Sequence, residues 1–291
     1  MKSDLIQIYF LPLIAGLLIV VACGSEKREL PETAVASAPR SIAATAAPRW
    51  TSPATPTTEF TPSPAAVTPS QQAEPVVCSP LEGVGILDLP AMVVNPFAPP
   101  PPGRDEPHHG VDIAQRDAQT QISLEGLRVQ AVLQGRVAAA IDERFPYGNA
   151  LILETLISEL PEDLQAELPS LAPTPAARSP LTCPQVAQDN AGELERESLY
   201  LLYAHLKEPP DLQVGALVSC GQTLGAIGSS GNALNPHLHL EARVGPAGVS
   251  FSSLGHYDSR LTPQEMANYC YWRISGWFRL VDPFLILGLN P

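Results

Sequence analysis

The sequence predicts a mostly β fold for residues 77–291, and two observations support that prediction. Runs of strand length with alternating or strongly apolar character recur through this region, for example at residues 127–141, 150–153 and 199–206. Turn-forming residues separate these runs, among them Tyr147-Gly148-Asn149. The region is long enough to bury a sizeable core, so we expect it to form a single folded domain.

The first 22 residues predict an export signal. Residues 5–22 form an apolar run interrupted by Pro12, and Lys2 supplies a positive charge before it. Small residues end the run directly before Cys23, an order that resembles a bacterial lipobox. That resemblance implies cleavage before Cys23, lipidation of its thiol and anchoring of the exported protein to the cell membrane. The alternative is an uncleaved membrane helix, for which a run of this length is barely enough.

Residues 23–76 predict a tether. They are rich in Pro, Ser, Thr and Ala, and they carry too few large apolar side chains to bury a core. We therefore expect a disordered, partly extended segment that holds the folded domain away from the membrane. A glycosylated stalk is an alternative for the same composition.

Charge and cysteine content restrict the class of protein. The formal net charge is -13, which argues against a nucleic-acid-binding protein, because such a protein needs a basic face. Apart from Cys23, the chain has four cysteines, Cys78, Cys183, Cys220 and Cys270. An even number in an exported domain predicts two disulfides, and the sequence leaves all three pairings open. The sequence contains no Cys-x-x-Cys spacing, so a metal site formed by cysteines is not favoured.

Residues 157–198 interrupt the strand pattern and predict a surface insertion. Six prolines and several acidic residues fall here, with one short helix expected near residues 162–168. The insertion is either a lid over a functional site or a solvated loop pinned by Cys183. After it, residues 198–206 return to strand, hairpin turns follow at residues 214–225, and a second helix is expected at residues 263–271.

Histidines mark the candidate site. In the strand-like run 236–241, His237 and His239 alternate with apolar residues, so both project from the same face. That spacing suits one metal ligand and one neighbouring acid–base group. Four residues separate His108 from Asp112, and an imidazole with a carboxylate is a common zinc ligand pair. A turn at Gly110 can fold these two side chains together, whereas we expect His109 to be no ligand.

The chain carries these motifs in a fixed order: His108-x-x-x-Asp112, Tyr203-Ala204-His205, and Pro236-His237-Leu238-His239-Leu240-Glu241, with Tyr147-Gly148-Asn149 and Val214-Gly215 between them. Taken in this order, the motifs resemble the lysostaphin/LytM-type zinc endopeptidases. The resemblance covers roughly residues 105–245. It implies a mostly antiparallel β domain of the LytM type (the duplicated hybrid motif), sandwich-like, with a groove on its central sheet and short helices.

The resemblance also implies roles. His108, Asp112 and His239 would hold one Zn²⁺ per chain, and His205 with His237 would act as the acid–base pair. Asn149 would line the substrate groove. The substrate would be peptidoglycan stem or bridge peptides, cleaved outside the cytoplasm by a protein expected to be a monomer.

One departure and one alternative bear on these roles. Some members of the family carry a tyrosine shortly before the first histidine, but here that stretch is Pro99–Gly103 without a tyrosine. The rate and substrate preference of the family therefore do not carry over to this chain. The alternative function is a non-catalytic wall-binding protein that activates other peptidoglycan hydrolases. That class has lost zinc ligands, whereas His108, Asp112 and His239 are all present in this chain.

Overall fold

The computed structural model describes residues 77–114, 123–168, 179, 181–186 and 192–289, all within one unit that spans residues 68–291. The predicted signal peptide (residues 1–22), Cys23 and the tether up to residue 76 lie outside the described residues. Among the helices that are described, none combines the length and the apolar character needed to cross a membrane.

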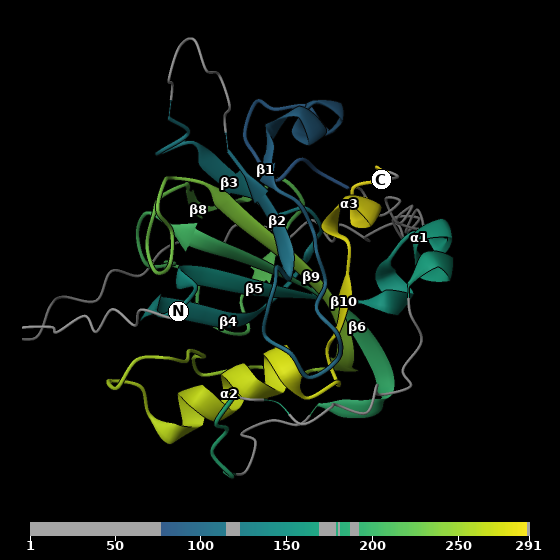
Figure 1. Ribbon diagram of the computed structural model, residues 1–291. Coiled ribbons are helices and arrows are strands. Elements are labelled where there is room, and N and C mark those ends of the chain that lie inside the picture. Colours follow the sequence, from purple (N-terminus) through teal and green to yellow (C-terminus); the bar gives the residue numbers. More distant parts are fainter. Residues whose placement is uncertain (1–76, 115–122, 169–178, 180, 187–191, 290–291) are drawn as a thin grey trace, which may run out of the picture. The chain divides into compact units, whose positions relative to one another are not determined.

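An antiparallel β-sheet forms the centre of the domain (Figure 1). Its hydrogen-bonded order is β1-β2-β9-β6-β5-β4-β7, and β10 also pairs with β9. The strands are β1 (Val93–Asn95), β2 (Gly110–Ile113), β4 (Gly135–Arg144), β5 (Gly148–Leu156), β6 (Glu193–Leu206), β7 (Leu217–Val218), β9 (Leu238–Ala247) and β10 (Arg279–Val281). A two-stranded sheet of β3 (Arg128–Gln130) and β8 (Thr223–Ala226) lies outside that order. The predicted fold class, mostly antiparallel β, is confirmed.

Both faces of the sheet are buried, which explains why the strands read as near-continuous apolar runs. On β6, Leu199, Leu201 and Tyr203 pack into one core, with side chains of β2, β9 and the N-terminal segment. The alternate residues of β6, Tyr200, Leu202 and Ala204, pack into a second core on the other face. The central strand β6 thus packs against a hydrophobic core on each face of the sheet.

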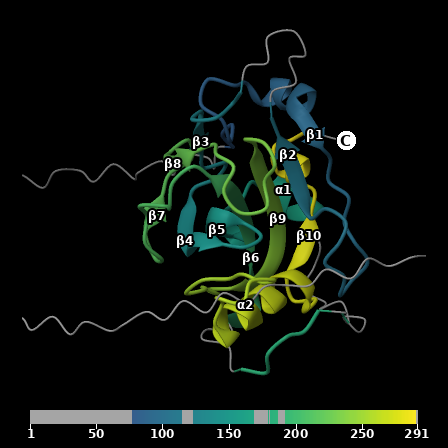
Figure 2. The ribbon, with the colours of Figure 1, turned by 60° about the vertical axis from the view of Figure 1, so that its left-hand side comes forward.

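Helix α2 (Pro263–Ile274) covers the second face (Figures 1 and 2). Its start is well defined, because Thr262 accepts a hydrogen bond from the backbone N–H of Glu265 and the Glu265 side chain accepts one from the backbone N–H of Thr262. Pro263 supplies the first helical residue. Trp272 is fully buried against Tyr200, Phe251 and Phe278. The predicted helix is therefore present and extends three residues further than expected.

The remaining helices are short: the 3-10 helices η1 (Ile86–Met92) and η2 (Ile157–Glu159), and the α-helices α1 (Glu162–Glu167) and α3 (Pro283–Ile286). Two of these elements, η2 and α1, lie in the predicted insertion. Leu160 and Leu164 of that region are buried against the first core, so the described start of the insertion is packed rather than solvated. Its end also differs from expectation, because β6 begins at Glu193 instead of Ser198. Four of the five residues at 193–197 are charged, so this strand extension has no apolar pattern.

Two disulfides close the domain, as predicted. Cys78 pairs with Cys220, and Cys183 pairs with Cys270. The first links the start of the domain to the chain between β7 and β8. The second links residues 181–186, the described part of the late insertion, to the last turns of α2. The structure thereby selects one of the three pairings that the sequence left open.

Candidate metal centre and active site

Strand register brings Asp112 and His239 together. The neighbouring strands β2 and β9 pair antiparallel, and Asp112 lies directly opposite His239. Gly110 allows this close pairing, since a Cβ at its position would lie 2.3 Å from the carbonyl oxygen of Leu240. His108 precedes β2 and is fixed by its backbone, which exchanges hydrogen bonds with Ala98. In place of the turn expected at Gly110, the chain bends at His109, and Gly110 is already the first residue of β2.

Three donor atoms of these residues converge. Nε2 of His108 lies 3.1 Å from Oδ1 of Asp112 and 3.2 Å from Nδ1 of His239, and the third separation, between His239 and Asp112, is 2.8 Å. A tetrahedral zinc with ligand bonds of about 2.0 Å has donors about 3.3 Å apart. The three side chains are mostly buried, with 15%, 14% and 8% exposure for His108, Asp112 and His239. Their spacing therefore fits the corners of a metal coordination shell.

The ring nitrogens that point away from the three converging donors, Nδ1 of His108 and Nε2 of His239, also fit a metal site. Nδ1 of His108 lies 2.9 Å from the carbonyl oxygen of Pro96, and Nε2 of His239 lies 3.4 Å from Oε2 of Glu241. These oxygens can only accept, so each outer nitrogen carries the proton and donates. In the neutral rings, Nε2 of His108 and Nδ1 of His239 therefore present lone pairs to the same point. An oxygen partner behind each ligating imidazole is typical of protein metal sites.

Electrostatics favour positive charge at this point. Burial raises the pKa of Asp112, but its contacts with His108 and His239 outweigh burial and hold that pKa well below its usual range. Burial lowers the pKa of His239, but the carboxylates of Asp112 and Glu241 on either side raise it overall. A proton on the imidazoles or a bound cation satisfies these carboxylates, and three converging donors suit a metal ion better than a single proton.

His205 and His237 lie beside the donor group. Their ring centroids are 4.7 Å apart, and Nε2 of His237 is 3.6 Å from Oδ1 of Asp112. Each ring is oriented through Nδ1, which donates to a carbonyl oxygen: Ser230 at 2.8 Å for His205 and Asn235 at 2.7 Å for His237. Both rings therefore present Nε2 as a proton acceptor. Burial, followed by the neighbouring histidines, lowers the pKa of His205 to about 3, which keeps its ring neutral.

A tight loop holds His205 in place. Residues 228–232 lie against the turn between β4 and β5, where a Cβ on Gly148 would come within 2.4 Å of the backbone nitrogen of Gly231. A Cβ on Gly231 would meet the backbone nitrogen of Gly148 at 2.3 Å, so both positions require glycine for close approach. This contact places the carbonyl of Ser230 next to the His205 ring. His205 itself has a positive φ of 62°.

The structure does not bring Asn149 into the groove. Its side chain is buried, its Oδ1 accepts from the backbone N–H of Glu143, and its amide nitrogen donates to the carbonyl of Leu206. Asn149 thus fixes the turn and the end of β6 instead of facing substrate.

His109 lies apart from the donor group, and its Nδ1 accepts from Arg243 at 2.5 Å. His256 contacts the carbonyl of Thr182 through Nε2.

A buried polar cluster contacts the donor group through His239. Glu241 is fully buried; its Oε1 accepts from Arg243, and its Oε2 accepts from the Tyr147 hydroxyl at 3.0 Å and from Arg273 at 3.4 Å. Strand alternation could have found Glu241, because it lies two residues after His239 and so shares its face. No sequence signal indicates Arg273, which lies on α2.

A single cavity of about 1180 Å³ contains the candidate site. His108, Asp112, His205, His237 and His239 all line it, and aromatic side chains of Phe145, Tyr147, Tyr257 and Tyr269 contribute to its walls. Tyr257 is 56% exposed, and its hydroxyl donates to Asp105 at 2.5 Å. The cavity is larger than the usual pocket for a small ligand, so it can accommodate an extended peptide segment.

Comparisons with known proteins agree with the resemblance found in the motifs. The sequence model of peptidase family M23 matches residues 193–251, which include His205, His237 and His239 but not His108 or Asp112. This match confirms the similarity to M23 peptidases over that stretch. Among curated proteins, no sequence matches the chain.

Several solved structures are similar to the chain. The catalytic domain of the prophage-encoded M23 protein EnpA from Enterococcus faecalis has 19% identity and a TM-score of 0.32, with 55% of this chain and 85% of that chain covered. The catalytic domain of lysostaphin from Staphylococcus simulans has 22% identity and a TM-score of 0.33, with 55% and 86% covered. A zinc-containing peptidase from Vibrio cholerae has 20% identity and a TM-score of 0.29, with 52% and 32% covered. These similarities are too distant to transfer an activity.

Proposed function

We propose that the chain is a zinc-dependent endopeptidase that hydrolyses peptide bonds in peptidoglycan cross-links. The observation that carries the proposal is the convergence of His108, Asp112 and His239 beside two further imidazoles. The match of residues 193–251 to peptidase family M23 supports a peptidase. The large groove supports a peptide substrate rather than a small molecule.

His108, Asp112 and His239 would hold the zinc ion, and Glu241 and the Pro96 carbonyl would orient the two ligand imidazoles. When bound, zinc lowers the pKa of water toward neutrality and polarises the scissile carbonyl. Three protein ligands would leave one position of a tetrahedral zinc site for water or substrate, as catalytic zinc requires.

The two remaining imidazoles would move the proton. A neutral imidazole with an open Nε2 can accept a proton from the attacking water while the water oxygen bonds to the carbonyl carbon. The same ring can then donate that proton to the leaving nitrogen as the C–N bond breaks. The second ring, when protonated at Nε2, can donate to the developing oxyanion. We assign this pair of roles to His205 and His237, whose Nδ1 atoms are already engaged with carbonyl oxygens.

We also infer that the protein works outside the cytoplasm. The two disulfides suit an oxidising compartment. The lipobox-like order before Cys23 supports a lipid anchor, and residues 23–76 would then set the reach of the domain from the membrane. Metabolic labelling with a palmitate analogue would test the anchor, since a Cys23→Ser protein should lose the label; equal labelling of both proteins would contradict it.

The non-catalytic alternative has less support. A regulator that had lost catalysis would have no need to keep a complete donor set or an oriented acid–base pair. Here the ligand atoms of all three candidate ligands lie within 4.8 Å of one another, and His205 and His237 are both oriented by an Nδ1 hydrogen bond to a carbonyl oxygen. The endopeptidase is therefore the function that the geometry supports best.

Digestion of purified cross-linked peptidoglycan tests the proposal. The oxidised, zinc-loaded protein is incubated with the polymer, and new amino termini and shortened peptides are identified by mass spectrometry. The His237→Ala protein, which retains all three candidate ligands, is the matched control. We expect new termini from the native protein alone. No cleavage by zinc-loaded native protein would contradict the proposal, and equal cleavage by both proteins would contradict the role of His237.

A further inference from the structure

We propose that Arg273 on helix α2 is a positioning residue for the metal centre. It would hold His239 through Glu241 and the chain before His108 through Asp105. The inference rests on the proposed function, since it concerns the same candidate ligands. It goes beyond that function because α2 lies outside the residues matched by the peptidase family model.

The first connection runs from Arg273 to His239. Nη1 of Arg273 lies 3.4 Å from Oε2 of Glu241, and Nε2 of His239 lies 3.4 Å from the same oxygen. The other carboxylate oxygen, Oε1, accepts from Arg243. Without Arg273, Oε2 would keep only the Tyr147 hydroxyl and the imidazole as partners. Arg273 therefore helps to fix the oxygen that determines which nitrogen of His239 carries the proton.

The second connection runs from Arg273 to the chain before His108. Nε of Arg273 donates to Oδ1 of Asp105 at 2.6 Å, and Nη2 donates to the backbone carbonyl of the same residue at 2.9 Å. Asp105 also accepts from the hydroxyls of Tyr257 and Tyr269. Asp105 is three residues before His108, so these bonds restrain the approach of the first ligand. The Arg273 guanidinium thus restrains both His239, through Glu241, and the chain before His108, through Asp105.

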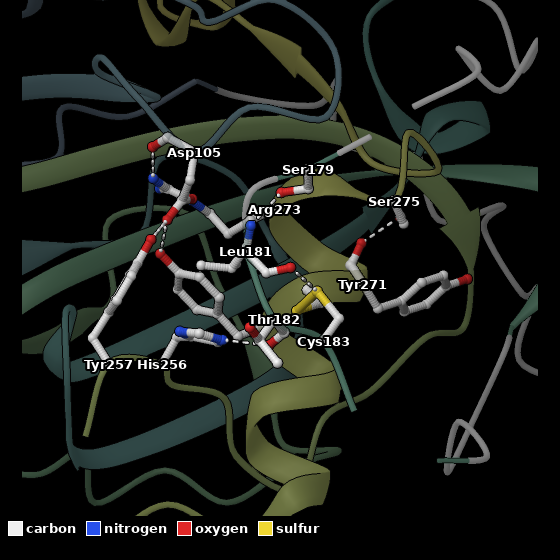
Figure 3. Close-up of a disulfide and its surroundings, with 12 residues drawn as sticks. Asp105, Ser179, Leu181, Thr182, Cys183, His256, Tyr257, Tyr271, Arg273 and Ser275 are labelled. Carbon is white, nitrogen blue, oxygen red and sulfur yellow. Dashed lines mark hydrogen bonds and ion pairs between the residues drawn. A yellow bond between two sulfur atoms is a disulfide. The ribbon is translucent and has the colours of Figure 1, made fainter. Parts of the chain in front are cut away.

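Helix α2 is well suited to position this side chain. Figure 3 shows Arg273 directed toward Asp105 and, nearby, the disulfide that joins Cys183 to the same helix. The bridged residue of α2, Cys270, lies one turn before Arg273, and Trp272 between them is fully buried. The guanidinium also lies 5.7 Å and 5.6 Å from the ring centroids of Tyr147 and Tyr269. The side chain is only 9% exposed, so its geometry is set by packing as well as by charge.

The geometry requires arginine rather than any cation. A guanidinium offers five donors in a fixed planar fork, and here they reach Asp105, Glu241 and the Tyr147 hydroxyl at once. A lysine ammonium is a single point of charge and cannot span these partners. Arg273→Lys should therefore keep the buried charge but lose part of the positioning.

Zinc affinity measured by competition with a chromogenic chelator tests the proposal. We expect Arg273→Gln to weaken zinc binding by up to about 10- to 100-fold, the range found when direct partners of metal ligands, such as Glu241, are removed. Arg273→Lys should weaken it by less, and it keeps the proposal testable if the glutamine protein does not fold. Arg260→Gln is the matched control, because that arginine is 82% exposed and pairs with Asp258. Unchanged zinc affinity in the folded Arg273 proteins would overturn the proposal.

The visible absorption spectrum of the cobalt-substituted protein separates positioning from general stability, because it reports the geometry of the bound metal. We expect a shifted spectrum for Arg273→Lys and the native spectrum for Arg260→Gln and for a protein destabilised by removal of the Cys78–Cys220 bridge. An unshifted spectrum for Arg273→Lys would contradict positioning. A native protein that binds zinc but cleaves no peptidoglycan would overturn only the proposed function, whereas an active native protein with unaffected Arg273 variants would overturn only this inference.

Discussion

The two disulfides provide a matched pair of perturbations. Replacing Cys183 and Cys270 by serine opens a loop with a sequence separation of 87, and replacing Cys78 and Cys220 opens one of 142. The chain-entropy relation gives about 4.6 and about 5.0 kcal/mol for these loops at 25 °C, before any relaxation of the native state lowers the values. Because the relation is logarithmic, the two bridges should contribute to the free energy of unfolding within about 0.4 kcal/mol of each other.

Their effects on the metal centre should differ. Only the Cys183–Cys270 bridge anchors α2, the helix that carries Arg273. We therefore expect its loss to weaken zinc binding, by less than Arg273→Gln does, whereas loss of the Cys78–Cys220 bridge leaves zinc affinity unchanged.

Urea denaturation of the metal-free proteins measures the free energy of unfolding, and competition with a chelator measures the zinc affinity. Unfolding free energies that remain at the native value without Cys183–Cys270 would refute the entropy argument. Equal loss of zinc affinity in both double-serine proteins would refute the coupling through α2.

Three further predictions concern the site itself. His239→Ala should reduce the zinc content, measured by atomic emission, from one ion per chain to near zero; a retained ion would exclude it as a ligand. His237→Ala should keep zinc but lower the cleavage rate about 10²- to 10⁴-fold in an amine-release assay, the range for a lost acid–base group. Gly148→Ala should destabilise the fold by about 1–3 kcal/mol in urea titration, because the added Cβ meets the backbone of Gly231 and φ is +68°. Native stability would show that the loop can move away.

Local patterns predicted the parts of the molecule that local physics determines. Strand alternation located residues 199–206 and the core of β9, which begins at Leu238, two residues later than the predicted run 236–241, and continues to Ala247. Capping residues around Thr262 define the start of the predicted helix. The motif residues His108, Asp112 and His239 converge because β2 pairs with β9 in the register that sets Asp112 opposite His239. That register depends on tertiary packing, and only the family resemblance pointed to it from the sequence.

What local patterns missed depends on long-range contacts. Arg273 reaches Asp105 across a sequence separation of 168, and neither residue has a periodic or motif signal. The family resemblance implies a place in the groove for Asn149, but its amide is used by the backbone of Glu143 and Leu206. A motif of turn residues does not reveal which side of the turn its polar side chain faces.

Anomalous diffraction at the zinc edge, from crystals of the zinc-loaded protein, would locate the metal on which the proposed chemistry depends. We expect one strong peak per chain, about 2.0–2.2 Å from Nε2 of His108, an oxygen of Asp112 and Nδ1 of His239. A peak bound instead through His205 or His237 would contradict the assignment of ligands and acid–base groups. Absence of a peak among these residues in zinc-loaded crystals would contradict the metal centre itself.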